Sequence, residues 1–200
     1  MTVLRGLVGF TFFHLAFWLR SQDQGTLWFA AVVGVSALAS MFGNAVASML
    51  RARVREETML TTALLVCAGA GLLVSVLGGP LGAVVLAGVL NLMAALGRLN
   101  FESIVQRDAP DANQGRAFAV FETRFQLAWA IGAFIAVALQ VSGSIGFLIV
   151  GSVAVAASIH LFTRGRTDGK RPSSVSRRRP GRARGQVPRS RSGSARPSDR

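Results

Sequence analysis

The side chains that could carry chemistry in this sequence are polar residues set inside long apolar stretches. Glu122, Gln126 and Trp129 have the i, i+4, i+7 spacing that places three side chains on one face of a helix. Polar residues within a membrane span are costly and are therefore functional candidates by default. This face could line a pathway for a small molecule, or it could bond neighbouring helices as structural support.

Three further polar residues share that setting. His14 lies among phenylalanines, and histidine is the side chain that most readily changes charge near neutral pH. The alternative is a neutral histidine hydrogen-bonded to the next helix. Asn44 and Asn91 could contact a substrate or bridge helices. Glu122 has its own alternative, which is an ion pair with Arg98, Arg116 or Arg124 that acts as a conformational latch.

The sequence gives little support for a catalytic site or a metal site. Ser144 and His160 share one predicted span, but sixteen residues of helix separate them by about 24 Å. His14 is left as a geometrically possible partner for Ser144, although no motif favours it. The two histidines lack metal-ligand spacing, and no glycine-rich phosphate loop ends in Lys-Ser or Lys-Thr. We therefore expect no enzyme, no metal and no cofactor.

The elements that must position these residues are membrane spans. Uncharged runs cover residues 27–50, 58–97 and 125–163, whereas about 20 apolar residues suffice to cross a bilayer. The two longer runs would extend for about 60 Å as single helices, so each must fold back. Glycine, serine and proline at 78–80 and 142–146 supply the breaks. The predicted spans are 27–50, 58–77, 80–97, 118–140 and 145–163.

A sixth, shorter span is predicted at the N-terminus. Only 14 uncharged residues, Gly6 to Leu19, lie between Arg5 and Arg20. Both arginines can extend toward opposite headgroup layers, and Trp18 is suited to the interface. A cleaved signal peptide is the rival interpretation, but the segment after Arg20 lacks an Ala-x-Ala site. The fold class expected is an all-α bundle of about six transmembrane spans over residues 1–163.

Arginines in the short connections predict the orientation, because basic residues are retained on the cytoplasmic side. The other connections carry almost no charge. The chain is therefore expected in the cell membrane with both termini in the cytoplasm. The residues expected in cytoplasmic connections or at their edges are Arg51, Arg53, Arg55, Arg98, Arg107, Arg116 and Arg124.

The C-terminal segment 164–200 holds most of the net charge. It contributes +11 of the formal +13 and is rich in arginine, serine, glycine and proline. Such a segment cannot bury enough apolar surface to offset its ordering entropy, so it is predicted to be a disordered cytoplasmic tail. Binding to RNA or phosphorylation is possible chemistry for it, but a solvated basic tail near anionic headgroups is favoured over a nucleic-acid partner.

Several stretches resemble a known family. Residues 102–110 (ESIVQRDAP), 114–118 (QGRAF) and 121–129 (FETRFQLAW), followed by Gly132, resemble the cytoplasmic loop and next helix of bacterial major facilitator exporters. The basic stretch 43–55 resembles the loop after the eighth helix of the same family. The resemblance covers residues 1–163.

The resemblance implies that this chain supplies the family's helices seven to twelve. It would then be half of a secondary-active transporter that works by alternating access, here of the efflux type for an unknown small molecule. Such transporters have twelve spans, so the implied partners are the lipid bilayer, the small molecule, and a second six-helix half or another copy of this chain. The alternative is a truncated transporter fragment or a non-transporting scaffold with a basic interaction tail.

Overall fold

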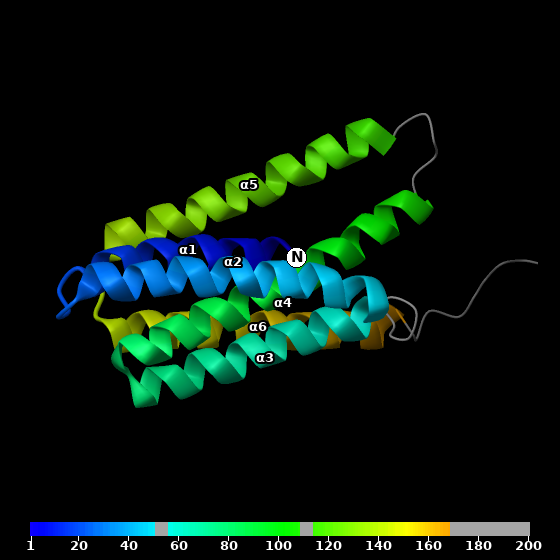
Figure 1. Ribbon diagram of the computed structural model, residues 1–200. Coiled ribbons are helices and arrows are strands. Elements are labelled where there is room, and N and C mark those ends of the chain that lie inside the picture. Colours follow the sequence, from blue (N-terminus) through cyan, green and yellow to red (C-terminus); the bar gives the residue numbers. More distant parts are fainter. Residues whose placement is uncertain (51–55, 109–113, 169–200) are drawn as a thin grey trace, which may run out of the picture. The chain divides into compact units, whose positions relative to one another are not determined.

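A computed structural model describes residues 1–50, 56–108 and 114–168 of the chain. They lie in one compact unit, Met1–Gly169, while the second unit, Lys170–Arg200, falls outside the described residues. The unit consists of helices joined by short connections (Figure 1). The helices are α1 (Thr2–Leu19), α2 (Gly25–Leu50), α3 (Glu56–Leu77), α4 (Gly79–Asp108), α5 (Gln114–Leu139) and α6 (Gly143–Asp168).

All six helices are long and apolar enough to cross a membrane. The short N-terminal segment is among them, since Thr2–Leu19 forms a continuous helix that packs into the bundle. The predicted all-helical transmembrane fold is therefore confirmed, and the chain is a multi-pass membrane protein. The candidate spans begin and end within a few residues of the predicted ones.

Several helix ends differ from the predicted boundaries, and those of α4 and α6 change where the connections lie. α4 continues to Asp108 through a segment expected to be a loop, because no glycine or proline interrupts it before Pro110. α6 continues past the predicted boundary at 163 to Asp168. α6 also begins earlier, at Gly143, so the break between α5 and α6 is 140–142 and Gly146 is helical. Gly143 and Gly146 serve close packing against α1 rather than a turn.

The connections 20–24, 78 and 140–142 lie at one end of the unit, which we call the turn end (Figure 1). The opposite end, where α2, α4 and α6 finish, is called the tail end. At the turn end α3 and α4 are separated by Gly78 alone, which lies within the break predicted at 78–80. Gly78 and Gly79 have φ values of +67° and +79°, which glycine adopts without steric cost.

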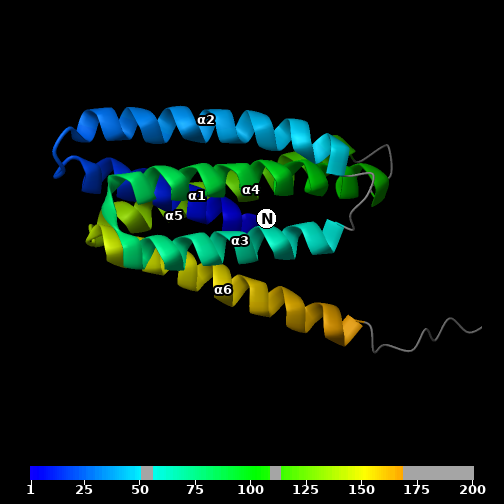
Figure 2. The same ribbon diagram turned by 60° about the horizontal axis from the view of Figure 1, so that its bottom comes forward.

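Helices far apart in the sequence pair side by side. The most extensive contacts are between α2 and α4, between α1 and α5, and between α3 and α6 (Figure 2). α1 and α4 also contact each other and are the two spans most buried within the unit. The core is therefore built around these two helices. Its largest fully buried side chains include Leu4, Leu15, Leu19, Leu86, Leu90 and Phe147.

The outer surface of the unit is strongly apolar. Val76 is 85% exposed, Phe134 73% and Met41 70%, and many other large apolar side chains are exposed on the spans. Soluble monomers rarely expose contiguous apolar surface of this extent. Hydrocarbon chains solvate such side chains without cost, so the surface fits a lipid environment.

Candidate functional site

The first polar group of the site is a hydrogen-bonded pair on α5. Gln126 Nε2 donates to Glu122 Oε1 at 2.8 Å, one helical turn away. Glu122 is half-buried and Gln126 is exposed, so the pair faces outward from the unit. A shallow hollow runs along this face of α5. Its lining residues are Ala119, Glu122, Thr123, Gln126, Leu127 and Ala130.

Arginines from two other helices approach the same carboxylate. Arg98 of α4 places its guanidinium nitrogen 3.9 Å from Glu122 Oε2. Arg5 of α1 interacts electrostatically with both Arg98 and Glu122. We call Arg5, Arg98, Glu122 and Gln126 the charged cluster. It joins α1, α4 and α5 in their tail-end halves, and the Glu122–Arg98 pair in it has the geometry of the latch considered from sequence.

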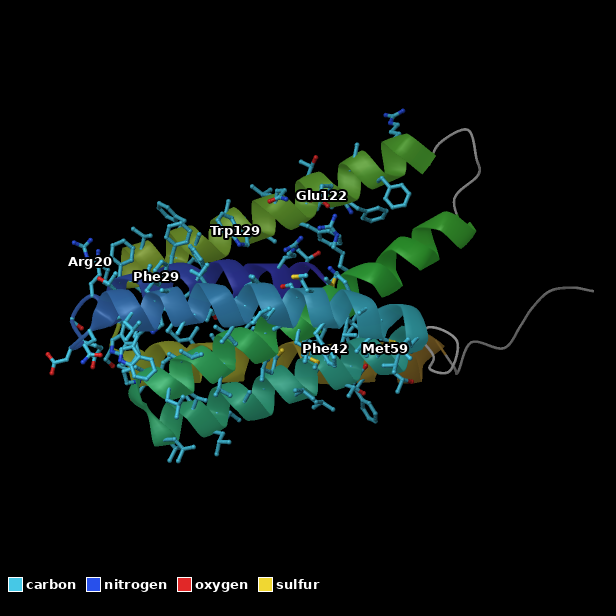
Figure 3. All side chains as sticks on the ribbon, viewed as in Figure 1. Arg20, Phe29, Phe42, Met59, Glu122 and Trp129 are labelled. Atoms are coloured by element: carbon cyan, nitrogen blue, oxygen red, sulfur yellow. The ribbon has the colours of Figure 1, made fainter. Side chains whose placement is uncertain are left out.

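Trp129 follows the pair along α5 toward the turn end (Figure 3). Its ring packs edge-on against Phe13 of α1, with the ring centres 5.8 Å apart. The backbone of Trp129 also lies directly against Gly9 of α1. The indole is therefore part of the contact between α1 and α5. Glu122 and Gln126 are polar side chains that line the hollow on the outward face of α5.

The second polar group lies in the turn-end half of α1. His14 is buried, stacks on Phe10 with ring centres 5.6 Å apart, and meets Phe147 of α6 edge-on at 5.9 Å. Trp18 also meets Phe147 edge-on, at 5.5 Å. His14 Nε2 has no hydrogen-bond partner among the described residues, and the same is true of Thr11 Oγ1. The backbone of Gly143, the first residue of α6, hydrogen-bonds the imidazole, as the neutral-histidine alternative expected, whereas Nε2 makes no such bond.

A cavity of about 420 Å³ opens beside His14 at the turn end. It lies between α1, the end of α5 and the connection to α6. The other lining residues are Phe17, Trp18, Ser21, Ala136, Gln140, Val141 and Ser142.

The two asparagines occupy different environments. Asn91 is half-buried, and its Nδ2 donates to the Ala87 carbonyl of its own helix at 2.9 Å. Its amide is therefore at least partly satisfied within α4. Asn44 is exposed on α2, in a span apolar enough to cross a membrane. The structure brings neither asparagine into the charged cluster.

The remaining arginines divide by position. Arg116 and Arg124 are exposed on α5, and Arg124 lies over the Phe121 ring at 5.9 Å from its centre. Of the three arginines considered for a latch with Glu122, Arg98 is the one placed against it. Arg107 belongs to α4, but its side chain is not described, and positions 51, 53 and 55 lie outside the described residues.

Ser144 lies at the start of α6 and His160 lies sixteen residues further along the same helix, and both are exposed. His14 Nε2 does not hydrogen-bond Ser144, since that nitrogen has no hydrogen-bond partner in the described part of the chain. Within the described ranges, no group of three His, Cys, Asp or Glu residues is placed to hold a metal ion.

Two residues near these polar sites, one in the charged cluster and one beside His14, were not candidates from the sequence. Arg5 was interpreted as a headgroup anchor, yet it interacts with Arg98 and Glu122. Thr11 was overlooked, although its i, i+3 relation to His14 places both on one helical face. The spacing was therefore the available signal for Thr11, whereas Arg5 needed the three-dimensional approach of α1 to α4 and α5.

Comparison with known proteins does not assign the chain to a family. No protein-family profile matches the chain, and no solved structure matches it. The chain is 22% identical over 156 residues to an uncharacterized protein of Mycobacterium leprae. The match covers 76% of this chain and 27% of that protein, so the chain spans about a quarter of the length of the relative.

Proposed function

We propose that this chain is one six-helix half of a secondary-active transporter of the major facilitator type, exporting a small molecule. In this proposal it lies in the cell membrane with both termini in the cytoplasm, and its activity is transport rather than catalysis. The observation that carries the proposal is the Glu122–Gln126 pair on the outward face of α5.

The pair lies within a helix that is otherwise suited to lipid. The span Phe118–Leu139 contains both residues, and the rest of the unit covers Glu122 only in part and leaves Gln126 exposed. A carboxylate and an amide facing hydrocarbon are expensive, so membrane proteins turn such groups toward protein or toward a water-filled pathway. The pair therefore favours a polar pathway or a second protein unit beside α5.

The distribution of burial among the helices also supports a second unit beside α5. α2 and α5 are the two spans least buried within the described unit. α2 also exposes Asn44. A second six-helix unit that covers α5 and α2 would enclose the polar groups and leave the apolar faces to lipid. The greater length of the Mycobacterium leprae relative fits a unit of this kind as part of a longer protein.

The alternative function is a membrane scaffold. In that case the helices anchor the chain, and the basic segment 164–200 binds a partner, with anionic headgroups as the favoured one. The scaffold needs no polar pathway, and the Glu122–Gln126 pair would then bond only within the bundle.

Co-purification and transport together test the proposal. The tagged full chain is extracted from native membranes, and the expected result is a second six-helix chain, or a second copy of this one, in stoichiometric amount. The reconstituted assembly should then move a fluorescent dye across liposomes. A chain that purifies alone, and an assembly that moves no substrate from a panel of dyes, would favour the scaffold.

A further inference from the structure

The turn-end half of α1 holds two buried polar groups that packing alone does not explain. His14 is 2% exposed, and Thr11, one turn earlier on the same face, is 3% exposed. Neither His14 Nε2 nor Thr11 Oγ1 finds a hydrogen-bond partner among the described residues. The Gly143 backbone hydrogen-bonds the imidazole elsewhere on the ring, but a buried polar atom left without a partner destabilises a fold. Packing therefore does not account for the unpartnered Nε2.

The cavity at the turn end gives that imidazole a polar approach. His14 lies at its buried end, whereas Ser21, Gln140 and Ser142 line it and are exposed. Two hydroxyls and an amide can each bond water, so the turn-end mouth of this cavity is suited to water. Histidine is the side chain suited to accept a proton near neutral pH.

Among the residues that the structure describes, the elements packed around His14 supply no opposite charge beside the ring. On α1 and α6 the ring meets Phe10 and Phe147, and no other residue that lines the cavity from α1, α5 or the connection to α6 is ionisable. The next ionisable residues along the chain are Arg20, which lines a separate hollow between α1 and α2, and Asp23 in the connection. A proton on His14 would thus create a buried charge without a counter-ion, which is costly unless the site gains water.

The contact that excludes water from the ring is made by glycines. A Cβ on Gly146 of α6 would overlap His14 Nε2, and a Cβ on Gly143 would overlap the indole of Trp18. The backbone of α6 therefore presses directly on both rings. Hydration of the imidazole on this side requires α6 to move away from α1.

We propose that His14 is a proton-binding site and that its protonation from the turn end loosens the contact between α1 and α6. The ligand is the proton itself, and the charge it brings is hydrated as the two glycines separate from His14 and Trp18. This site is separate from the charged cluster, and its operation does not depend on the chain being a transporter.

The first test follows the two histidines of the chain directly. The full chain is labelled with ¹⁵N-histidine in lipid nanodiscs, and the imidazole signals are recorded by NMR as the pH is lowered. His160→Gln assigns the remaining signal to His14. The expected result is a reversible change of the His14 signal from neutral to protonated imidazole while the protein stays folded. A His14 signal that stays neutral until the protein unfolds would overturn the proposal.

The second test measures the movement of α6 from α1. In a chain with Trp28→Phe and Trp129→Phe, the remaining Trp18 reports on its contact with Gly143. Acid should shift its emission to the red as the indole gains water, and this shift should be lost in His14→Gln. His160→Gln is the matched control and should keep the shift. The proposal is wrong if the acid shift persists in His14→Gln.

A third variant covers the case in which His14→Gln does not fold. Gly146→Ala forces α6 away from the ring without any proton, so its Trp18 emission should already be shifted to the red at neutral pH. Gly69→Ala is the control, because a Cβ at Gly69 of α3 meets nothing within 4 Å. An unshifted Gly146→Ala emission would show that the glycine contact does not shield Trp18, and the proposal would fail.

Discussion

Gly132 of α5 lies so close to Gly6 of α1 that a Cβ on Gly132 would overlap the Gly6 carbonyl. One turn further along α1, a Cβ on Gly9 would likewise overlap the carbonyl of Trp129. The two helices therefore touch backbone to backbone. Helix association in lipid depends on such close van der Waals packing, because apolar burial gives little advantage there. This contact holds the helix that carries Glu122 against the helix that carries His14.

Gly132→Ala should therefore destabilise the bundle. The added methyl group has no space, and overpacking a well-packed contact costs about 1–3 kcal/mol. Thermal unfolding of the purified chain in detergent measures the effect. Gly115→Ala on the same helix is the control, because its Cβ would meet nothing within 4 Å. A Gly132→Ala chain as stable as Gly115→Ala would contradict the close contact.

A second pair of glycines makes the same prediction for α3 and α6. A Cβ on Gly71 would lie 2.7 Å from the Gly151 backbone nitrogen, whereas Gly69 has open space at the same place. Gly71→Ala should lower the free energy of unfolding by about 1–3 kcal/mol through overpacking, and the unfolding temperature should fall with it. Gly69→Ala should be neutral or slightly stabilising. Equal unfolding temperatures for the two variants would show that α3 and α6 pack less closely than described.

The spans were predictable because the bilayer restricts helix length. A run such as 58–97 cannot cross once, and Gly78 marks where it folds back. The break before α6 was predicted at 142–146 from its glycines and serines, and it lies at 140–142. Gly143 and Gly146 look like turn residues in sequence, but they lie in the helix and serve the contact with Trp18 and His14. Glycine can mean either a turn or a close approach, and only the neighbouring helix distinguishes them.

The site was predictable only in part. The spacing of Glu122 and Gln126 predicts that the two can meet, and they are hydrogen-bonded. The choice of Arg98 rather than Arg116 as the nearby cation depends on the packing of α4 beside α5, which no local pattern encodes. Arg5 joins for the same reason, since α1 lies against both helices.

The two asparagines should respond differently to replacement by leucine. Asn44→Leu exchanges an exposed amide for an apolar side chain in the α2 span, so the isolated unit should tolerate it in detergent. If a second unit covers α2, the change should reduce co-purification of that unit several-fold. Asn91→Leu is the contrast, because Asn91 is half-buried and bonds the Ala87 carbonyl of its own helix. It should alter stability more than association. Equal co-purification with Asn44→Leu and with the unaltered chain would remove α2 from the proposed interface.

Glu122 provides the most direct test of the charged cluster. Glu122→Gln removes the charge that faces Arg98 but keeps an oxygen for Gln126. Both partners in the ion pair are 45% exposed and 3.9 Å apart, so its loss should cost the fold under about 1 kcal/mol. Transport by the reconstituted assembly should nevertheless fall tenfold or more. Arg124→Gln, a neutralisation elsewhere on α5, is the control and should retain transport. Unchanged transport at unchanged abundance would show that Glu122 has only a packing role.

The reversed pair distinguishes a latch from a substrate contact. A latch depends on the attraction between positions 98 and 122, so Arg98→Glu combined with Glu122→Arg should recover much of the transport that either change removes alone. A carboxylate that contacts substrate must stay at position 122, and the double variant would then remain inactive. Dye uptake by the two single variants and the double variant, at matched abundance in the same liposomes, gives the coupling between the two sites. Recovery assigns Glu122 to a conformational contact between α4 and α5, and failure to recover assigns it to the pathway.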